Sequence, residues 1–120
     1  MTKSADSKQP GTRSNDPTVL ILTSLASEPK HGYALLQDIE GFAGVRLGPG
    51  TLYGAISRLE ERGLIEAMGE KGRRRPYRIT GAGAEVLRET LAEMGTIVAV
   101  GSKRLGIVAA PGIATAGGAA

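Results

Sequence analysis

The sequence predicts a mainly α-helical (α+β) domain that carries one small antiparallel β wing. Two patterns lead to this prediction. Three segments with helical apolar spacing precede two short strand-like segments joined at a glycine turn, and a long heptad-patterned segment follows them. A length of 120 residues suits one ordinary domain. Because 41% of the residues are apolar and 22% are charged, the chain can bury a packed core.

Two helices are expected first. Asp16 followed by Pro17 marks the start of one, because aspartate caps a helix and proline suits its first position. The apolar residues within 19–26 lie on nearly every face, which predicts a helix at the buried centre of the domain. A second helix is expected over about residues 31–43, and residues 45–47 are a candidate for a brief edge strand. The predicted core stripe of the second helix consists of Tyr33, Leu36 and Ile39, with Phe42 as a further candidate.

A third helix is expected over about residues 51–62. Thr51 or Gly50 can cap it, and Gly63 is suited to stop it, because glycine readily adopts the left-handed conformation after a helix. Its expected buried stripe consists of Leu52, Ile56 and Leu59, which recur at helical spacing.

Two strands and a long helix are expected next. The strands cover residues 64–68 and 73–80 and flank a turn at 69–72, and Thr80 then caps the helix. Apolar and small residues continue along this helix with alternating steps of three and four, which is a heptad seam. The seam consists of Ala84, Leu87, Leu91, Met94, Val98, Gly101 and Leu105.

The order of these elements is typical of a winged helix-turn-helix with an additional C-terminal helix. The expected organisation is a disordered arm at 1–15, a winged helix-turn-helix domain at 16–80, a dimerisation helix at 81–106 and a flexible tail at 107–120. The arm is polar and the tail is rich in Gly and Ala, so neither segment buries enough apolar surface to offset the entropy lost on ordering.

This fold suggests where DNA would bind. In a helix-turn-helix the later helix enters the major groove, and the exposed side chains of its N-terminal half meet base edges. The candidates on this recognition helix are Thr51, Tyr53, Gly54, Ser57 and Arg58. A basic hairpin beside that helix can grip the phosphate backbone. The candidates on this wing are Lys71, Arg73, Arg74 and Arg75.

Several classes of function do not fit the composition. The chain has no Cys, which excludes disulfides and thiolate zinc sites. It has a single histidine, His31, and shows no nucleophile–base pair or paired carboxylates. The sequence therefore predicts no enzyme, no cofactor and no metal site. Since it shows neither a signal peptide nor an apolar run long enough to cross a bilayer, we expect a cytoplasmic protein with no membrane partner.

Three segments together resemble the PadR family of transcriptional regulators. They read HGYALLQDIE, LGPGTLYGAISRLEERGLIEA and RRRPYRITGAGAEVL, and the resemblance covers about residues 17–105. It implies a homodimer that binds a palindromic operator in double-stranded DNA, usually as a repressor. Many members release DNA when they bind a small, often hydrophobic, effector. This chain departs from the family in its Gly/Ala-rich tail and in lacking the tryptophan that some drug-sensing relatives place in the dimer pocket.

Other interpretations remain open beside these. The fold also serves as a protein–protein interaction module without DNA binding, although five basic residues and no acid between Lys71 and Arg78 favour DNA. The arginine cluster could be a solvated hairpin. Tyr53 either faces the duplex or packs. The heptad seam is expected to form a dimer interface through Leu87, Leu91, Met94, Val98 and Leu105, or it covers the domain's own core.

Overall fold

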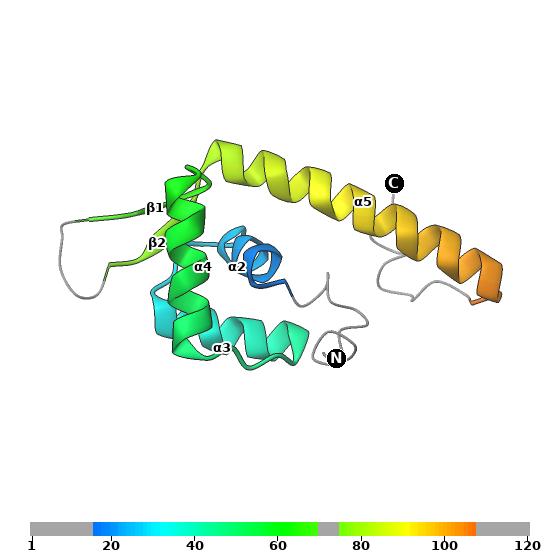
Figure 1. Ribbon diagram of the computed structural model, residues 1–120, viewed down its shortest axis with the longest axis horizontal. Helices are drawn as coiled ribbons and strands as arrows, with labels where there is room; N and C mark the ends of the chain where they lie inside the picture. The colour runs from blue at the N-terminus through cyan, green and yellow to red at the C-terminus, as the bar shows by residue number, and fades with distance from the viewer. Residues whose placement is uncertain (1–15, 70–74, 108–120) are drawn as a thin grey trace, which may run out of the picture. The chain divides into compact units, whose positions relative to one another are not determined.

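The computed structural model describes residues 16–69 and 75–107 of the chain. The elements in these ranges are α2 (Pro17–Leu25), α3 (Gly32–Ala43), α4 (Pro49–Glu61), β1 (Ile65–Ala67), β2 (Tyr77–Ile79) and α5 (Gly81–Leu105), labelled in Figure 1. The two strands pair as an antiparallel sheet. The predicted fold class, mainly helical with a small antiparallel wing, is confirmed.

Some predicted features lie outside the described residues. They are the N-terminal arm, residues 108–120 of the tail, and the wing residues Lys71, Arg73 and Arg74. The chain divides into two compact units, residues 1–87 and residues 88–120. The first unit therefore includes the first two turns of α5.

Helix α2 is the centre of the first unit, as its apolar composition predicts. Asp16 caps it by accepting a hydrogen bond from the Thr18 amide at 2.9 Å, and Pro17 occupies the first helical position. Ile21, Leu22 and Leu25 are almost completely buried. The helix packs against α3, α4 and β2, and Figure 1 shows it nearly end-on beside α3.

The predicted core stripe of α3 is partly wrong. Leu35 and Ile39 are completely buried, whereas Tyr33 is 67% exposed and Leu36 is only partly buried. Phe42, the further candidate, is also exposed. The buried side of α3 is set by Leu35, and a residue two positions away lies about 200° around the helix axis. Tyr33 therefore projects away from the core that receives Leu35.

Helix α4 begins earlier than predicted. It starts at Pro49, and Gly48 occupies the N-cap position without a side-chain hydrogen bond, so neither Thr51 nor Gly50 is the cap. Proline at the first helical position explains the early start, because its fixed φ angle suits that site. The predicted stripe is confirmed, since Leu52, Ile56 and Leu59 are buried, and Ala55 is buried with them.

The hairpin that follows is shorter than predicted. Its register pairs Ile65 with Ile79, Glu66 with Arg78 and Ala67 with Tyr77. Residues 45–47 do not form the expected edge strand. Instead, Lys30 forms an isolated antiparallel bridge with Tyr77, so β2 has β1 on one side and Lys30 on the other.

Thr80 connects the hairpin to α5, and its predicted capping role is confirmed. Its hydroxyl accepts a hydrogen bond from the Gly83 amide at 3.1 Å and donates one to the Gly63 carbonyl at 2.7 Å. Gly83 is buried against the backbone of Leu64. A Cβ atom at Gly83 would collide with the Leu64 carbonyl oxygen and lie 2.9 Å from Cγ1 of Ile79. The first turn of α5 therefore needs glycine at this point.

Replacing Gly83 by alanine should destabilise the first unit. Because the rigid Leu64 backbone cannot move away cheaply, we expect a loss of about 1–3 kcal/mol, the usual cost of overpacking. Gly81→Ala is the matched control, since nothing lies within 4 Å of a Cβ atom there. Urea unfolding at one protein concentration measures both variants. Equal free energies of unfolding for the two would show that α5 does not pack against Leu64 in this way.

Candidate nucleic-acid interface

The outer face of α4 carries the predicted recognition residues. Thr51, Ser57 and Arg58 are exposed, and Gly54 is partly so, on the side opposite the buried stripe. Side chains of a helix lean toward its N-terminus. Accordingly, a Cβ atom at Gly54 would lie only 3.7 Å from Nη1 of Arg58. The Arg58 guanidinium therefore lies over the small Gly54, and together they form a basic surface from which no bulky side chain projects at Gly54.

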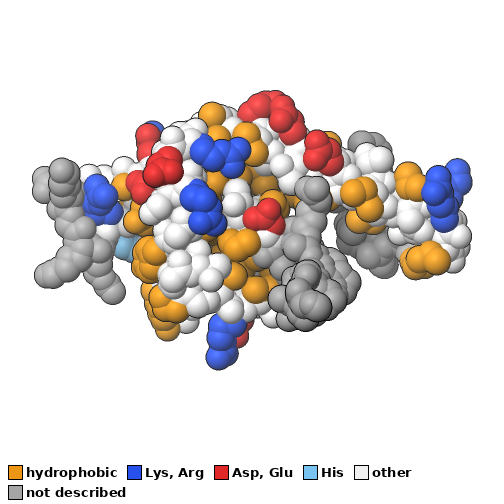
Figure 2. All heavy atoms as spheres, viewed as in Figure 1, with side chains coloured by type: hydrophobic (Ala, Val, Ile, Leu, Met, Phe, Trp, Pro, Cys, Tyr) orange, Lys and Arg blue, Asp and Glu red, His pale blue; other side chains and the backbone are white. Residues whose placement is uncertain are grey.

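Charge is unevenly distributed along α4. The first turn has no acidic residue, and Gly48 supplies no side-chain cap, so the early backbone N–H groups are available to an anion. Glu60 and Glu61 are exposed near the other end. Figure 2 shows acidic (red) and basic (blue) side chains next to one another on this side of the first unit. The N-terminal half of α4 is therefore the part best suited to lie against phosphates.

Tyr53 is partly packed against the protein and partly exposed. Its side chain is 49% exposed. The buried part lies against Gly32, the first residue of α3, where a Cβ atom would collide with the hydroxyl and lie 2.8 Å from Cζ. One edge of the ring is thus packed against α3, while the remainder is open to a partner.

The described part of the wing includes one of its predicted cations. Arg75 is partly buried and precedes β2. Arg78, which adds to the positive charge of the sequence, forms an ion pair with Glu66 across the hairpin, with 2.5 Å between Nη2 and Oε2. The pair partly neutralises Arg78, so the basic character of the wing depends on the residues before it.

Tyr77 lies where α4, β2 and the wing meet. Burial raises the pKa of its phenol above the ordinary value. The neighbouring Glu60 carboxylate and Tyr53 phenol raise this pKa further, whereas Arg75 opposes the rise. Glu60 and Tyr53 of α4 and Arg75 before β2 therefore lie close enough to Tyr77 to influence its phenol.

The predicted dimer residues fall into two groups. Leu87 is 7% exposed and belongs to the core of the first unit, so its burial requires no second chain. Leu91, Val98 and Leu105 are 46%, 56% and 76% exposed, and Met94 is partly buried. Figure 2 shows the hydrophobic side chains (orange) of the C-terminal part of α5 at the surface.

A second set of apolar residues on α5 was missed by the heptad pattern. Ile97, Val100 and Ile107 are also exposed. At about 100° per residue, Val100 lies nearly opposite Leu91 and Val98, and Ile97 lies about 100° from Val98. Ile107 follows the end of α5. Plotting the whole segment around the helix axis, rather than following one seam, would have found them.

Comparison with known proteins decides the family. The model of the transcriptional regulator PadR-like family matches residues 21–89. The chain belongs to this family. A PadR family regulator from Eggerthella lenta is 32% identical, with a TM-score of 0.67 over 84% of this chain and 91% of its own. A second, from Clostridium difficile, is 26% identical, with a TM-score of 0.67 over 74% of this chain and 97% of its own.

An uncharacterised 37.1 kDa protein in transposon Tn4556 of Streptomyces fradiae is 47% identical over 85 residues, which is 71% of this chain. The chain spans only 25% of that relative's length. The matched PadR-like region covers α3, α4, the hairpin and most of α2, and it therefore includes the candidate interface.

The chain therefore belongs to a family of transcriptional regulators, as the three motifs predicted. Within residues 16–69 and 75–107, no group of three or more His, Asp or Glu side chains is arranged to hold a metal ion. None of the helices described has the length and apolar character needed to cross a membrane.

Proposed function

We propose that this PadR-like regulator is a homodimeric, sequence-specific DNA-binding protein that acts as a repressor in the cytoplasm. The observation that carries the proposal is the outer face of α4. It joins exposed Thr51 and Ser57 to an Arg58 guanidinium that lies over Gly54, next to a basic wing. An interaction module for another protein would not need this combination of a small helix face and clustered cations.

In the proposed complex, α4 enters the major groove. The small Gly54 allows the helix to approach the base edges closely, and Arg58 is suited to a bidentate bond with guanine. The uncapped N-terminus of α4 faces a phosphate. Arg75, with the predicted wing residues Lys71, Arg73 and Arg74, holds the adjacent backbone, which adds affinity without sequence information.

The proposed dimer forms through the exposed part of α5. Leu91, Val98 and Leu105 share one side of this helix and expose large apolar surfaces. Burying such surface against a second chain is favourable at about 25 cal/mol per Å². A two-fold dimer would then present two copies of α4 to a palindromic operator, about one helical turn apart.

Regulation by a small hydrophobic effector is the last part of the proposal. It follows the behaviour of many PadR regulators and would act by favouring a dimer whose two α4 helices no longer match the spacing of the operator. The affinity of the dimer for DNA would fall by the factor by which the effector prefers that state.

The first test concerns Arg58. Arg58→Ala should weaken binding to the selected operator by about 1–3 kcal/mol and relax discrimination at one base pair, because a bidentate base contact is lost. Arg62→Ala is the matched control, since Arg62 is exposed one turn later on the same side-chain row and carries the same charge. Anisotropy titrations against the operator and single-base variants compare the two. Equal losses without any change in base preference would reject a base contact by Arg58.

The second test concerns the dimer. Leu91→Asp should give monomers that lose operator binding, because a carboxylate cannot be buried cheaply in an apolar interface. Ala92→Asp introduces the same charge at the next exposed position of α5, off the seam, and should remain dimeric. Sedimentation gives the association state, and an anisotropy titration gives the affinity. A wild-type monomer that still binds one half-site tightly would contradict the proposal.

A further inference from the structure

The turn between α2 and α3 contacts both elements that are proposed to meet DNA. This connection turn is defined as Lys30, His31 and Gly32. Its first residue exchanges two main-chain hydrogen bonds with the strand that leads from the wing: the Lys30 amide donates to the Tyr77 carbonyl at 3.1 Å, and the Tyr77 amide donates to the Lys30 carbonyl at 2.9 Å. Its last residue receives the ring of Tyr53 from α4.

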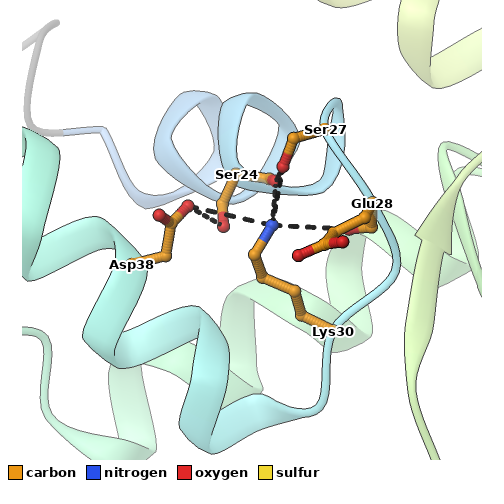
Figure 3. A network of polar contacts seen from close by, with 5 residues as sticks. All are labelled: Ser24, Ser27, Glu28, Lys30 and Asp38. Atoms are coloured by element: carbon orange, nitrogen blue, oxygen red, sulfur yellow. Dashed lines mark hydrogen bonds and ion pairs between the residues drawn. The ribbon is translucent and has the colours of Figure 1, made fainter.

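The side chain of Lys30 fixes the connection turn to α2. Its ammonium group donates to the Ser24 carbonyl at 2.6 Å and to the Ser27 hydroxyl at 2.9 Å (Figure 3). The carboxylate of Asp38 on α3 lies 3.9 Å away, and it also accepts a hydrogen bond from the Ser24 hydroxyl at 2.6 Å. The Lys30 side chain is only 10% exposed.

This position gives the ammonium group a clear physical role. The last carbonyl groups of a helix lack partners within the helix and carry partial negative charge. Lys30 donates to one of them, the Ser24 carbonyl, which also accepts from the Ser27 hydroxyl, and it adds an ionic attraction to α3. Since the main chain of the same residue pairs with Tyr77, the start of β2 is held by a residue whose own side chain is anchored in two helices.

Gly32 has a separate role at the other end of the turn. A methyl group there would occupy the volume of the Tyr53 hydroxyl and ring edge. Tyr53 is half-exposed and can turn away, so the cost to the fold would be smaller than at a site enclosed by backbone. The direction of Tyr53 on the face of α4 therefore depends on the absence of a side chain at Gly32.

We propose that Lys30 and Gly32 are positioning residues of the DNA interface, the first for the wing and the second for Tyr53. The inference rests on the proposed function, because it assigns separate parts of DNA recognition to the two residues. Lys30 governs contacts of the wing with the DNA phosphate backbone, and Gly32 governs recognition of DNA bases. The two effects are separable, since one acts through Tyr77 and the other through Tyr53.

Lys30→Met tests the first assignment, because methionine keeps an unbranched, apolar side chain but removes the ammonium group. In the free protein, hydrogen exchange should show protection of the Tyr77 amide reduced about tenfold, while amides in α4 keep theirs. With DNA, the magnitude of the slope of log K against log salt should fall by about one, because a loosened wing loses a phosphate contact. Arg75→Ala is expected to give the same change, since it removes one cation of the wing. Ser27→Ala removes one acceptor of the ammonium group, together with the hydrogen bond that the Ser27 hydroxyl donates to the Ser24 carbonyl at 3.0 Å. It should change both quantities in the same direction by less, which keeps the test valid if Lys30→Met does not fold.

Gly32→Ala tests the second assignment, with Gly41→Ala as its control on the same helix, where nothing lies within 4 Å of a Cβ atom. In the free protein, the NMR signals of the Tyr53 ring should shift in Gly32→Ala only. With DNA, Gly32→Ala should lower the preference at one base pair about fivefold to tenfold, within the usual range for one mismatch, and leave the salt slope unchanged.

The outcomes separate this inference from the proposed function. If the wild type binds a selected DNA site but Lys30→Met keeps both its Tyr77 protection and its salt slope, and Gly32→Ala behaves like Gly41→Ala, the positioning roles are wrong and DNA binding stands. If the wild type binds no duplex, the proposed function is wrong. The exchange and NMR measurements on the free protein then still decide whether Lys30 holds Tyr77 and Gly32 orients Tyr53.

Discussion

The arrangement of the first unit depends on the burial of α2. This helix is apolar on nearly every side, and Ile21, Leu22 and Leu25 are almost completely enclosed by elements from the rest of the unit. Because α3, α4 and β2 all pack against it, their positions relative to one another are fixed through α2. The outer face of α4 and the start of the wing are therefore held by a core that contains none of the proposed DNA contacts. At the end of α2, the Lys30 ammonium also links α2 to α3 through polar contacts with the Ser24 carbonyl and the Asp38 carboxylate.

For the proposed binding of DNA, the positions of the charged residues matter more than the net charge. The formal charge is only +3, and Arg46 pairs with Glu40 and Arg78 with Glu66. Such exposed pairs add little stability, but they reduce the positive potential available to a phosphate. Arg58, by contrast, lies over a glycine on the outer face of α4. A surface suited to DNA thus arises from a few cations in suitable positions on a weakly basic chain.

Local signals in the sequence were enough to predict the order of the elements, because caps and stripes involve neighbouring residues. Asp16 caps α2, Thr80 caps α5, and Leu52, Ile56 and Leu59 are buried. Some errors were local, such as the start of α4 at Pro49 and the exposure of Tyr33 on α3, and others arose where distant segments decide the outcome. Leu87 fits a heptad seam but is buried in its own unit, and the bridge from Lys30 to Tyr77 joins residues far apart in the chain. For the candidate interface, helical spacing predicted the exposed face of α4, whereas the contact of Tyr53 with Gly32 could not be deduced without the packing of α3 on α4.

The most direct test of the account is a hydroxyl-radical footprint of the full-length protein on a site selected from random duplex DNA. Two copies of α4 in a two-fold dimer should protect two symmetric segments on one face of the duplex, with centres about 34–36 Å or one helical turn apart. The flanking backbone should be protected by the wings. A single protected segment at saturation, or no protection of any selected sequence, would contradict the claim that this PadR-like regulator binds DNA as a two-fold dimer through α4.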